Sequence, residues 1–188
     1  MPTYTMPFDE LNNLQTQLVE LRPRLAASET RSEALEELIE LFWVLYAEAY
    51  LNGVNEANTQ LNGVAEARPE RFTEEALKPI AEKTFVDRLE EYAKTADIAS
   101  IYRVADTDSH RLYVTGELDA AIENGAATKT WHTMEDERVR DTHWPLEGVT
   151  VGINDVFATW DGDEAYEPGG FGLPQNNCNC RCWLTFDY

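Results

Sequence analysis

The three cysteines of the chain, Cys178, Cys180 and Cys182, form a C-x-C-x-C pattern. Thiolates bind soft metal ions, and zinc in proteins takes four ligands, drawn mostly from Cys and His. Alternate residues of a regular strand share a face but lie about 6.6 Å apart. Three such sulfur atoms cannot converge on one ion unless Cys178 lies in a turn, which Asn176-Asn177 favours. The pattern predicts a metal site or reduced cysteines at a strand start; a disulfide between alternate cysteines would be strained.

His143 is the natural fourth ligand for such a site. It precedes Trp144-Pro145, which predicts a turn rather than a regular element. The structural alternative is a partly buried histidine that is hydrogen-bonded to a backbone carbonyl. His110 and His132 have no comparable neighbours, so we expect both at the surface.

Four carboxylates surround His143 in the sequence: Asp136, Glu137, Asp141 and Glu147. Zinc with an open ligand position and a nearby carboxylate would suit hydrolysis. Cys180 or Cys182 with His143 could also act as a nucleophilic pair. However, no helix N-terminus or basic cluster is apparent that would lower a thiol pKa, and no P-loop, zinc-protease, α/β-hydrolase or dinucleotide-binding motif occurs. We therefore expect no catalytic residues and no enzymatic activity.

The chain is strongly acidic, with 35 Asp and Glu against 15 Lys and Arg among 188 residues and a net charge of −20. A protein that binds duplex nucleic acid needs a basic footprint, so direct binding to DNA or to an anionic membrane is not expected. Only 4 of the cations are Lys. An acidic, lysine-poor surface stays soluble in concentrated salt because salt screens its self-repulsion. The composition predicts a high-salt habitat or a basic partner.

The length is that of about one domain with an added helical arm. We expect an α+β fold, in which a helical N-terminal region (residues 1–125) precedes a small C-terminal module rich in strands and loops (residues 126–188). No run approaches the ~18 apolar residues of a membrane span. The N-terminus also lacks the basic and apolar parts of a secretory signal.

Apolar residues at steps of three and four predict the first helix. Asp9 can cap its start, and Pro23 should stop or kink it near Leu21. Its apolar stripe comprises Phe8, Leu11, Leu14, Leu18, Leu21 and Leu25.

The second predicted helix begins near Ser28 or Thr30, where Thr30 and Glu33 have the spacing of a capping box. Its segment 35–51 is apolar on nearly every side, which places it at the centre of the domain or under another chain. An apolar face without evident cover in a small chain indicates an interface.

Later elements are expected as follows. A third helix, capped by Thr73 and kinked at Pro79, turns Leu77, Ile80, Ala81, Phe85, Leu89 and Tyr92 inward. A fourth helix covers residues 109–124 and ends at Gly125. Strands are predicted at 128–134, 148–153 and 181–186, and residues 161–177 read as a loop.

The second half carries an ordered series of short motifs. They are the helix end 117–125, Lys129-Thr130-Trp131, the run 136–140, His143, Leu146-Glu147-Gly148, the strand 149–153, Phe157, Pro168-Gly169-Gly170, and Asn179-Cys180-Arg181-Cys182. No single motif is specific. The ordered set over residues 111–184 resembles the C-terminal domain of the Mu F-like minor head proteins of tailed phages, also called the phage head-morphogenesis family.

The resemblance implies a zinc site, from which this chain departs in part. Many members have Cys-x-x-Cys before a Leu-Asp-Gly turn and His-Pro-x-Cys-x-Cys at the end. Here Arg140 and His143 take the first pair of positions, while Asn177 and Cys178 replace the histidine and the proline. Without a metal, Arg138 and His143 would instead form a polar clamp between the loop and the terminal strand. The ligands that the resemblance implies are His143, Cys180 and Cys182, with Cys178 as a candidate fourth.

What the family implies is structural. Its members join the head at low copy number, associate with the portal and are linked to packaging or delivery of DNA. We therefore expect a minor capsid protein in several copies, in the capsid interior or at the portal vertex, and in the host cytoplasm during assembly. Some relatives carry toxin or ADP-ribosyltransferase domains behind this module, and we expect none here because the chain ends at Tyr188. Two alternatives remain: a zinc-binding interaction module outside the particle, and a metal-dependent hydrolase or nuclease.

Overall fold

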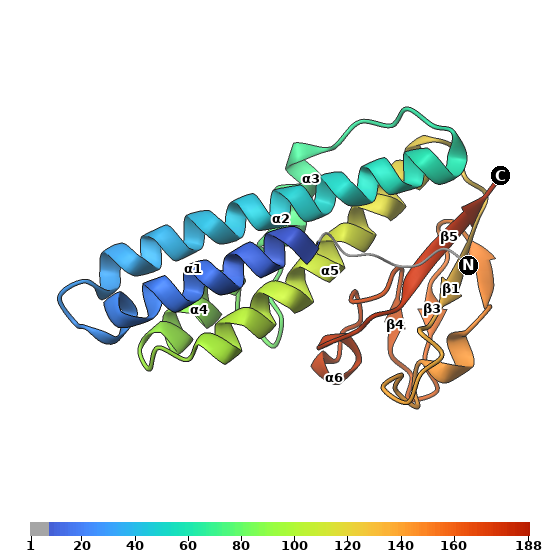
Figure 1. The fold of residues 1–188 in the computed structure, drawn as a ribbon. Coiled ribbons are helices and arrows are strands. Elements are labelled where there is room, and N and C mark those ends of the chain that lie inside the picture. Colours follow the sequence, from blue (N-terminus) through green and yellow to red (C-terminus); the bar gives the residue numbers. More distant parts are fainter. Residues whose placement is uncertain (1–7) are drawn as a thin grey trace.

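The computed structural model describes residues 8–188, without the side chains of residues 8–10 and 12. Long helices lie beside small antiparallel strands (Figure 1), so the expected α+β class is confirmed. The helices are α1 (Phe8–Ala26), α2 (Arg31–Leu61), α3 (Pro69–Ala76), α4 (Phe85–Ala93), α5 (Ile98–Glu123), the 3-10 helix η1 (Trp144–Leu146) and α6 (Pro174–Asn177). The strands are β1 (Thr128–His132), β2 (Thr150–Gly152), β3 (Phe157–Ala158), β4 (Glu164–Ala165) and β5 (Trp183–Asp187).

The leucine stripe of α1 is confirmed from Leu11 onward, where its five leucines are at most 3% exposed. The expected stop at Pro23 is wrong, because the helix continues to Ala26. Leu25 is fully buried, and its packing outweighs the hydrogen bond that Pro23 cannot donate. The predicted roles of Phe8 and Asp9 lie outside the described side chains.

α2 has Thr30 as its N-cap residue, as predicted, but the expected capping box with Glu33 is wrong. The Thr30 hydroxyl donates instead to the carbonyl oxygen of Arg24, at 2.8 Å. The apolar segment 35–51 is central rather than bare, because α1, α4 and α5 contact α2. Within that segment only Val44 and Leu51 remain exposed among the large apolar side chains. The interface that its composition suggested is therefore filled by the chain itself.

α2 and α5 cross at two glycines. A Cβ atom at Gly53 would lie 1.9 Å from the carbonyl oxygen of Tyr113, and one at Gly116 would lie 2.2 Å from that of Tyr50. Any side chain at these positions would push the helices apart. The close approach of the two backbones therefore depends on glycine.

α3 and α4 replace the single kinked helix that the sequence predicted, so that prediction is wrong. Thr73 lies inside α3, and the cap of α4 is Thr84, which forms a capping box with Asp87. Between the helices, Pro79 is followed by Ala81 and Glu82, both of which have positive φ. Left-handed backbone cannot continue a right-handed helix.

α5 begins at Ile98, earlier than the predicted residue 109, and its cap is Asp97. Its predicted end is confirmed, with Gly125 at φ 82° just beyond the helix. Every residue from 108 to 121 is buried, because helices and strands surround α5. The buried polar residues of α5 are Ser100, Asp108, Ser109, His110, Arg111, Thr115, Glu117 and Asp119.

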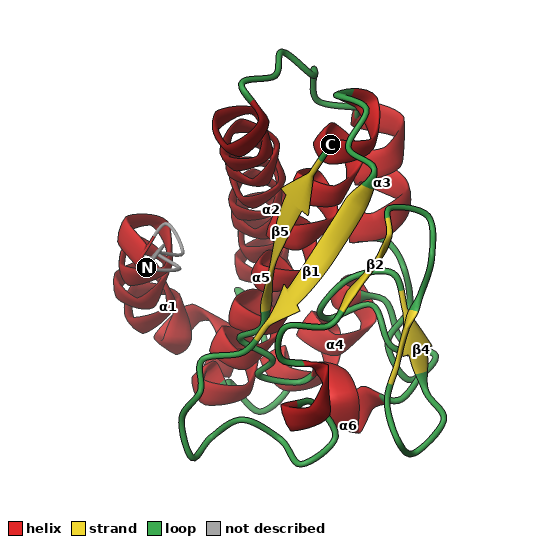
Figure 2. Cartoon of the chain, turned by 90° about the vertical axis from the view of Figure 1, so that its right-hand side faces the viewer, coloured by secondary structure: helices red, strands yellow, loops and turns green. Residues whose placement is uncertain are grey.

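The three-stranded sheet has the order β2-β1-β5, with all pairs antiparallel. In Figure 2 it lies in front of α2 and α5, and α1 lies apart from it. Lys129 and Trp131 of β1 are buried opposite Phe186 and Leu184 of β5. The three predicted strands are confirmed with shorter bounds, whereas the hairpin β3–β4 was not predicted and α6 falls in the expected loop. In the described part of the chain, no helix is long and apolar enough to cross a membrane.

Candidate metal centre

His143 is held in the interior at the end of a loop. Its backbone N–H donates to the carbonyl oxygen of Arg140 at 2.9 Å, and η1 follows directly. The residue is 1% exposed. Its ring contacts those of Trp131 and Phe171, at centroid distances of 5.6 and 5.4 Å. The aromatic walls fix the imidazole and shield it from water.

Cys180 and Cys182 approach His143 from the segment before β5. Asn179 has φ 55°, and the Cys180 N–H donates to the carbonyl oxygen of Asn177. The Sγ atoms of Cys180 and Cys182 lie 3.8 and 3.5 Å from His143 Nδ1. The three ligand atoms lie within 4.8 Å of one another. A turn here removes the spacing problem that a regular strand would pose for alternate cysteines.

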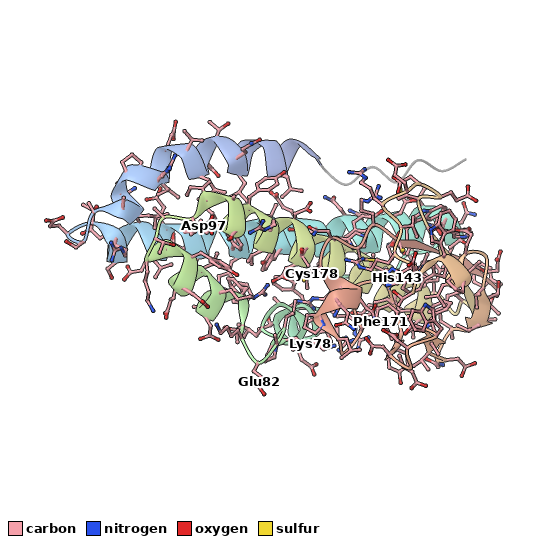
Figure 3. The ribbon with its side chains drawn as sticks, turned by 90° about the horizontal axis from the view of Figure 1, so that it is seen from below. Lys78, Glu82, Asp97, His143, Phe171 and Cys178 are labelled. Carbon is pink, nitrogen blue, oxygen red and sulfur yellow. The ribbon has the colours of Figure 1, made fainter. Side chains whose placement is uncertain are left out.

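Cys178 does not join this group. It follows α6 in a turn, as predicted, but its side chain is exposed. It lines a separate cavity of about 580 Å³ beside Lys83 and Arg103. Figure 3 shows Cys178 and His143 at different places along the molecule. Among the side chains that the structure describes, no further His, Cys, Asp or Glu joins His143, Cys180 and Cys182 as a fourth ligand.

The two clustered cysteines differ in acidity. A hydrogen bond from Cys182, with a second contact to His143, holds the pKa of the Cys180 thiol well below its ordinary value. The same pairing and burial raise the pKa of Cys182. Cys180 is thus the more acidic of the two thiols, and a nearby cation would stabilise its thiolate form.

The donor set fits three corners of a zinc site. Bonds of about 2.3 Å to sulfur and about 2.0 Å to nitrogen place tetrahedral S and N donors about 3.5 Å apart, close to the distances from His143 Nδ1 to the two sulfurs. The cavity beside His143 and Cys182 is only about 10 Å³, about the space that one water molecule needs. His143 Nε2 is buried without a hydrogen-bond partner in the described residues, so the outer acceptor common at zinc-binding histidines is not supplied.

The carboxylates that neighbour His143 in sequence are engaged elsewhere or exposed. Glu147 accepts a hydrogen bond from the Thr133 hydroxyl at 2.7 Å, and Asp136 pairs with Arg181. Among the hydrogen bonds and ion pairs of the described residues, none joins these carboxylates to His143. The arrangement therefore lacks a carboxylate positioned for hydrolysis beside the cluster.

The loop is clamped to the segment before β5 by Asp136 and Arg181. The two guanidinium nitrogens of Arg181 lie 2.6 and 2.9 Å from the carboxylate oxygens of Asp136. Arg138, which was expected in this role, is exposed, and its Nε lies 3.8 Å from the Asp136 carboxylate, farther than the nitrogens of Arg181. The predicted clamp between Arg138 and His143 is therefore wrong, because the bidentate partner comes from the cysteine segment itself.

The expected surface positions of two histidines need correction. His110 is 3% exposed, and its Nε2–H donates to the carbonyl oxygen of Cys182 at 2.9 Å. Burial lowers the pKa of His110. His132 is partly buried and stacks on Trp183, with ring centroids 4.3 Å apart. His110 lies within the predicted helix 109–124, and it is buried because helices and strands pack around this part of α5.

Asp163 and Asn176 organise the loops around the cluster, and the sequence analysis missed both roles. Asp163 accepts hydrogen bonds from the N–H groups of Gly172 and Leu173 at 3.0 Å and from Asn176 Nδ2 at 2.9 Å. Asn176 in turn accepts from the Thr142 hydroxyl at 3.0 Å, next to His143. The density of Gly, Asp and Asn in 161–177 signalled a loop, but not which side chains pair.

Comparison with known proteins identifies relatives of this chain. The sequence model of the family described as Phage Mu protein F like protein matches residues 73–185, which include the whole His143 cluster. The minor head protein GP7 of Bacillus phage SPP1 is 28% identical over 92 residues. That alignment covers 47% of this chain and 30% of GP7. No solved structure matches. The family resemblance of the motif series is confirmed.

Proposed function

The chain belongs to the Phage Mu protein F-like family, and from this premise we propose that it is a minor capsid protein of a tailed virus, placed at the portal vertex. The observation that carries the proposal is the family match over residues 73–185, together with the similarity to GP7 of phage SPP1, a minor head protein. The role would be in head assembly, DNA packaging or DNA delivery. Its partners would be the portal protein and other head proteins, in several copies per particle.

The role proposed is structural rather than enzymatic. The His143 cluster is closed, with a neighbouring cavity of about 10 Å³, as expected of a structural ion site rather than a catalytic one. With a net charge of −20, the chain would meet packaged DNA only indirectly. We assign residues 1–125 to association with the head and portal, and residues 126–188 to the module that carries the cluster.

We further propose that His143, Cys180 and Cys182 hold a zinc ion. Zinc would bind the cysteines as thiolates and tie the loop that carries His143 to the segment before β5. Cys178 would complete the ligand set only if its turn moved, since it is exposed and lines a different cavity.

The acidic composition supports a high-salt habitat as part of this proposal. Self-repulsion among excess carboxylates is strongest at low ionic strength. A thermal melting series from low salt to several molar salt is expected to show destabilisation at the low end. Melting temperatures that do not change with salt would remove this part and favour a basic partner instead.

Quantitative mass spectrometry of purified virus particles tests the main proposal, before and after triggered DNA ejection. We expect a few to a few tens of copies per particle, because a component of one vertex is present at low copy number. Loss on ejection would identify a delivered protein, and retention a component that stays in the head. Absence from particles, at a sensitivity that detects the portal protein, would overturn the proposal and favour a metal-binding interaction module outside the particle.

A further inference from the structure

Two tryptophans and a leucine remain exposed on the C-terminal part of the molecule. Trp160 is 71% exposed, Trp144 is 43% exposed and Leu173 is 40% exposed. Scattered single apolar residues need no explanation, but neighbouring exposed indoles are typical of interaction sites.

These side chains come from three separate segments that are tied together. Trp160 Nε1 donates to the carbonyl oxygen of Asp141 at 3.3 Å, which places this indole beside the turn that carries Trp144. The next residue, Thr142, donates to Asn176 of α6 at 3.0 Å. Leu173 is the N-cap residue of the same helix. The three apolar groups therefore lie on one linked set of loops.

The loop that carries Trp160 is closed by hydrogen bonds. The Thr159 N–H donates to the carbonyl oxygen of Asp163 at 2.9 Å, and the Gly162 N–H donates back to that of Thr159 at 3.0 Å. Asp163 is buried and accepts the N–H of Leu173 at 3.0 Å. Exposure of the indole is thus built into a closed hairpin. A preorganised aromatic anchor binds a partner with little loss of conformational entropy.

The charge beside these indoles is negative. Asp141 and Asp161 are both exposed, and no ion pair joins either to a cation among the described residues. A hydrogen bond from the Thr159 hydroxyl holds the pKa of Asp161 below its ordinary value, so this carboxylate stays ionised. Arg138 and Arg140, which precede Asp141 in the sequence, line the small cavity beside His143, and no ion pair joins either to Asp141 or Asp161 among the described residues. Aromatic faces next to carboxylates that have no cationic partner attract guanidinium and ammonium groups.

We propose that the indole patch, defined as Trp144, Trp160 and Leu173 with Asp141 and Asp161, docks an arginine- or lysine-bearing segment of another head protein. That the partner is a head protein rests on the proposed function. A cationic side chain of the partner would lie over an indole and pair with the carboxylates, while a neighbouring apolar side chain would contact Leu173. We expect the partner segment to be basic, because the carboxylates of the patch would repel an acidic one.

Binding of synthetic peptides to the purified full chain tests this surface. The probe is a set of overlapping fluorescent peptides from the portal and other head proteins of the same virus, followed by anisotropy. Basic peptides are expected to bind. Trp160→Ala should weaken them about tenfold or more, and Asp161→Asn, which retains an acceptor for the Thr159 hydroxyl, about threefold at low salt. Val64→Ala, at an 89% exposed residue after α2, is the control and should bind as wild type.

Three results would overturn the patch: no peptide binds, only neutral or acidic peptides bind, or Trp160→Ala binds as tightly as wild type. Thermal melting of each variant shows whether a loss of binding is merely a loss of folding. If Trp160→Ala does not fold, Asp161→Asn still tests the patch, because its side chain is exposed and its exchange should leave the fold intact.

Particle content separates this inference from the proposed function. Wild-type chain in particles together with undiminished Trp160→Ala chain would overturn the docking surface and leave the proposed function standing. Absence of the wild-type chain from particles would overturn the proposed function, and the peptide assay alone would then decide the patch.

Discussion

The α1–α2 helix pair and the loops around His143 are held together in different ways. The leucines of α1 pack as an apolar stripe, each at most 3% exposed. Around His143, buried polar groups such as Asp163 and Asn176 fix the backbone through specific donors and acceptors. Apolar packing tolerates exchange among side chains of similar volume, whereas a buried polar network fails when one partner is lost. The contact between α1 and α2 therefore depends on residue class, and the loop part depends on residue identity.

The largest expected effect lies at the crossing of α2 and α5, where the helical part also depends on residue identity. Gly53→Ala places a Cβ atom 1.9 Å from the carbonyl oxygen of Tyr113. We expect a loss of about 3–5 kcal/mol in the free energy of unfolding, since two long helices must separate. Urea unfolding followed by circular dichroism measures it, with exposed Asn55→Ala in the same helix as control. A loss below about 1 kcal/mol would contradict the close crossing.

Loss of a cluster ligand should come next. His143→Ala and Cys180→Ser are expected to lower the free energy of unfolding by about 3 kcal/mol, because zinc binding stabilises only the folded chain. A chelator should lower the melting temperature of the wild type and leave these variants unchanged. Cys178→Ser is the matched control, since this cysteine is exposed, and should retain both the metal and the stability.

The same variants separate a structural ion from a catalytic one. A structural site predicts a less stable His143→Ala chain, whereas a hydrolase would give a folded chain of normal stability that has lost activity. Wild-type protein that contains no metal by elemental analysis, and that melts identically with chelator, would refute the zinc proposal.

Much of the fold was predictable from the sequence, because apolar periodicity reports directly on packing. The Leu11–Leu25 stripe and β1 at Trp131 follow from side-chain class alone. The start of α5 could not be found this way. Asp108 of this helix is fully buried, where it pairs with Arg88 at 2.6 Å and accepts a hydrogen bond from the Tyr46 hydroxyl at 3.0 Å. In the sequence, a buried charged residue looks the same as an exposed one, so it hides the apolar period of the helix.

The candidate metal centre was predictable in part. His143, Cys180 and Cys182 are brought together, and their residue types carry the chemistry. Cys178 is not included, because its distance from the other cysteines depends on the φ of Asn179, which spacing does not reveal. The partners of these loops, such as Asp163, are set by backbone groups far away in sequence, for which side-chain patterns carry no signal.

A smaller loss is expected at the centre of the loop network. Asp163→Asn replaces a carboxylate that accepts the N–H groups of Gly172 and Leu173 and a bond from Asn176. One amide oxygen cannot serve all three donors, so we expect a loss of about 2 kcal/mol. Hydrogen exchange at residues 171–173 should rise along with it. Asp161→Asn, at an exposed neighbour, should cost far less; equal losses would contradict the central role of Asp163.

The smallest effect tests whether a buried charge weakens the C-terminal module. Lys129 is fully buried, and its Nζ has no hydrogen-bond partner among the described residues. It lies 5.2 Å from the ring centroid of Tyr166 and 5.6 Å from that of Phe157. Burial lowers its pKa to about 8. Because an unfolded lysine titrates near 10.4, the unfolded chain binds more protons between these values, so this residue makes stability rise with pH across that window.

Lys129→Met removes the charge and retains the volume. We expect this variant to be more stable than wild type at pH 7 by about 1 kcal/mol, a value reduced for screening by water. The difference should shrink as the pH approaches 10, because wild-type Lys129 is then neutral when folded. Urea unfolding of both chains at half-unit steps from pH 7 to 9.5 measures the difference, in which other titrating groups cancel. A difference that stays constant with pH would mean that the amine reaches water, and Lys129 would then not count among the buried polar groups of this module.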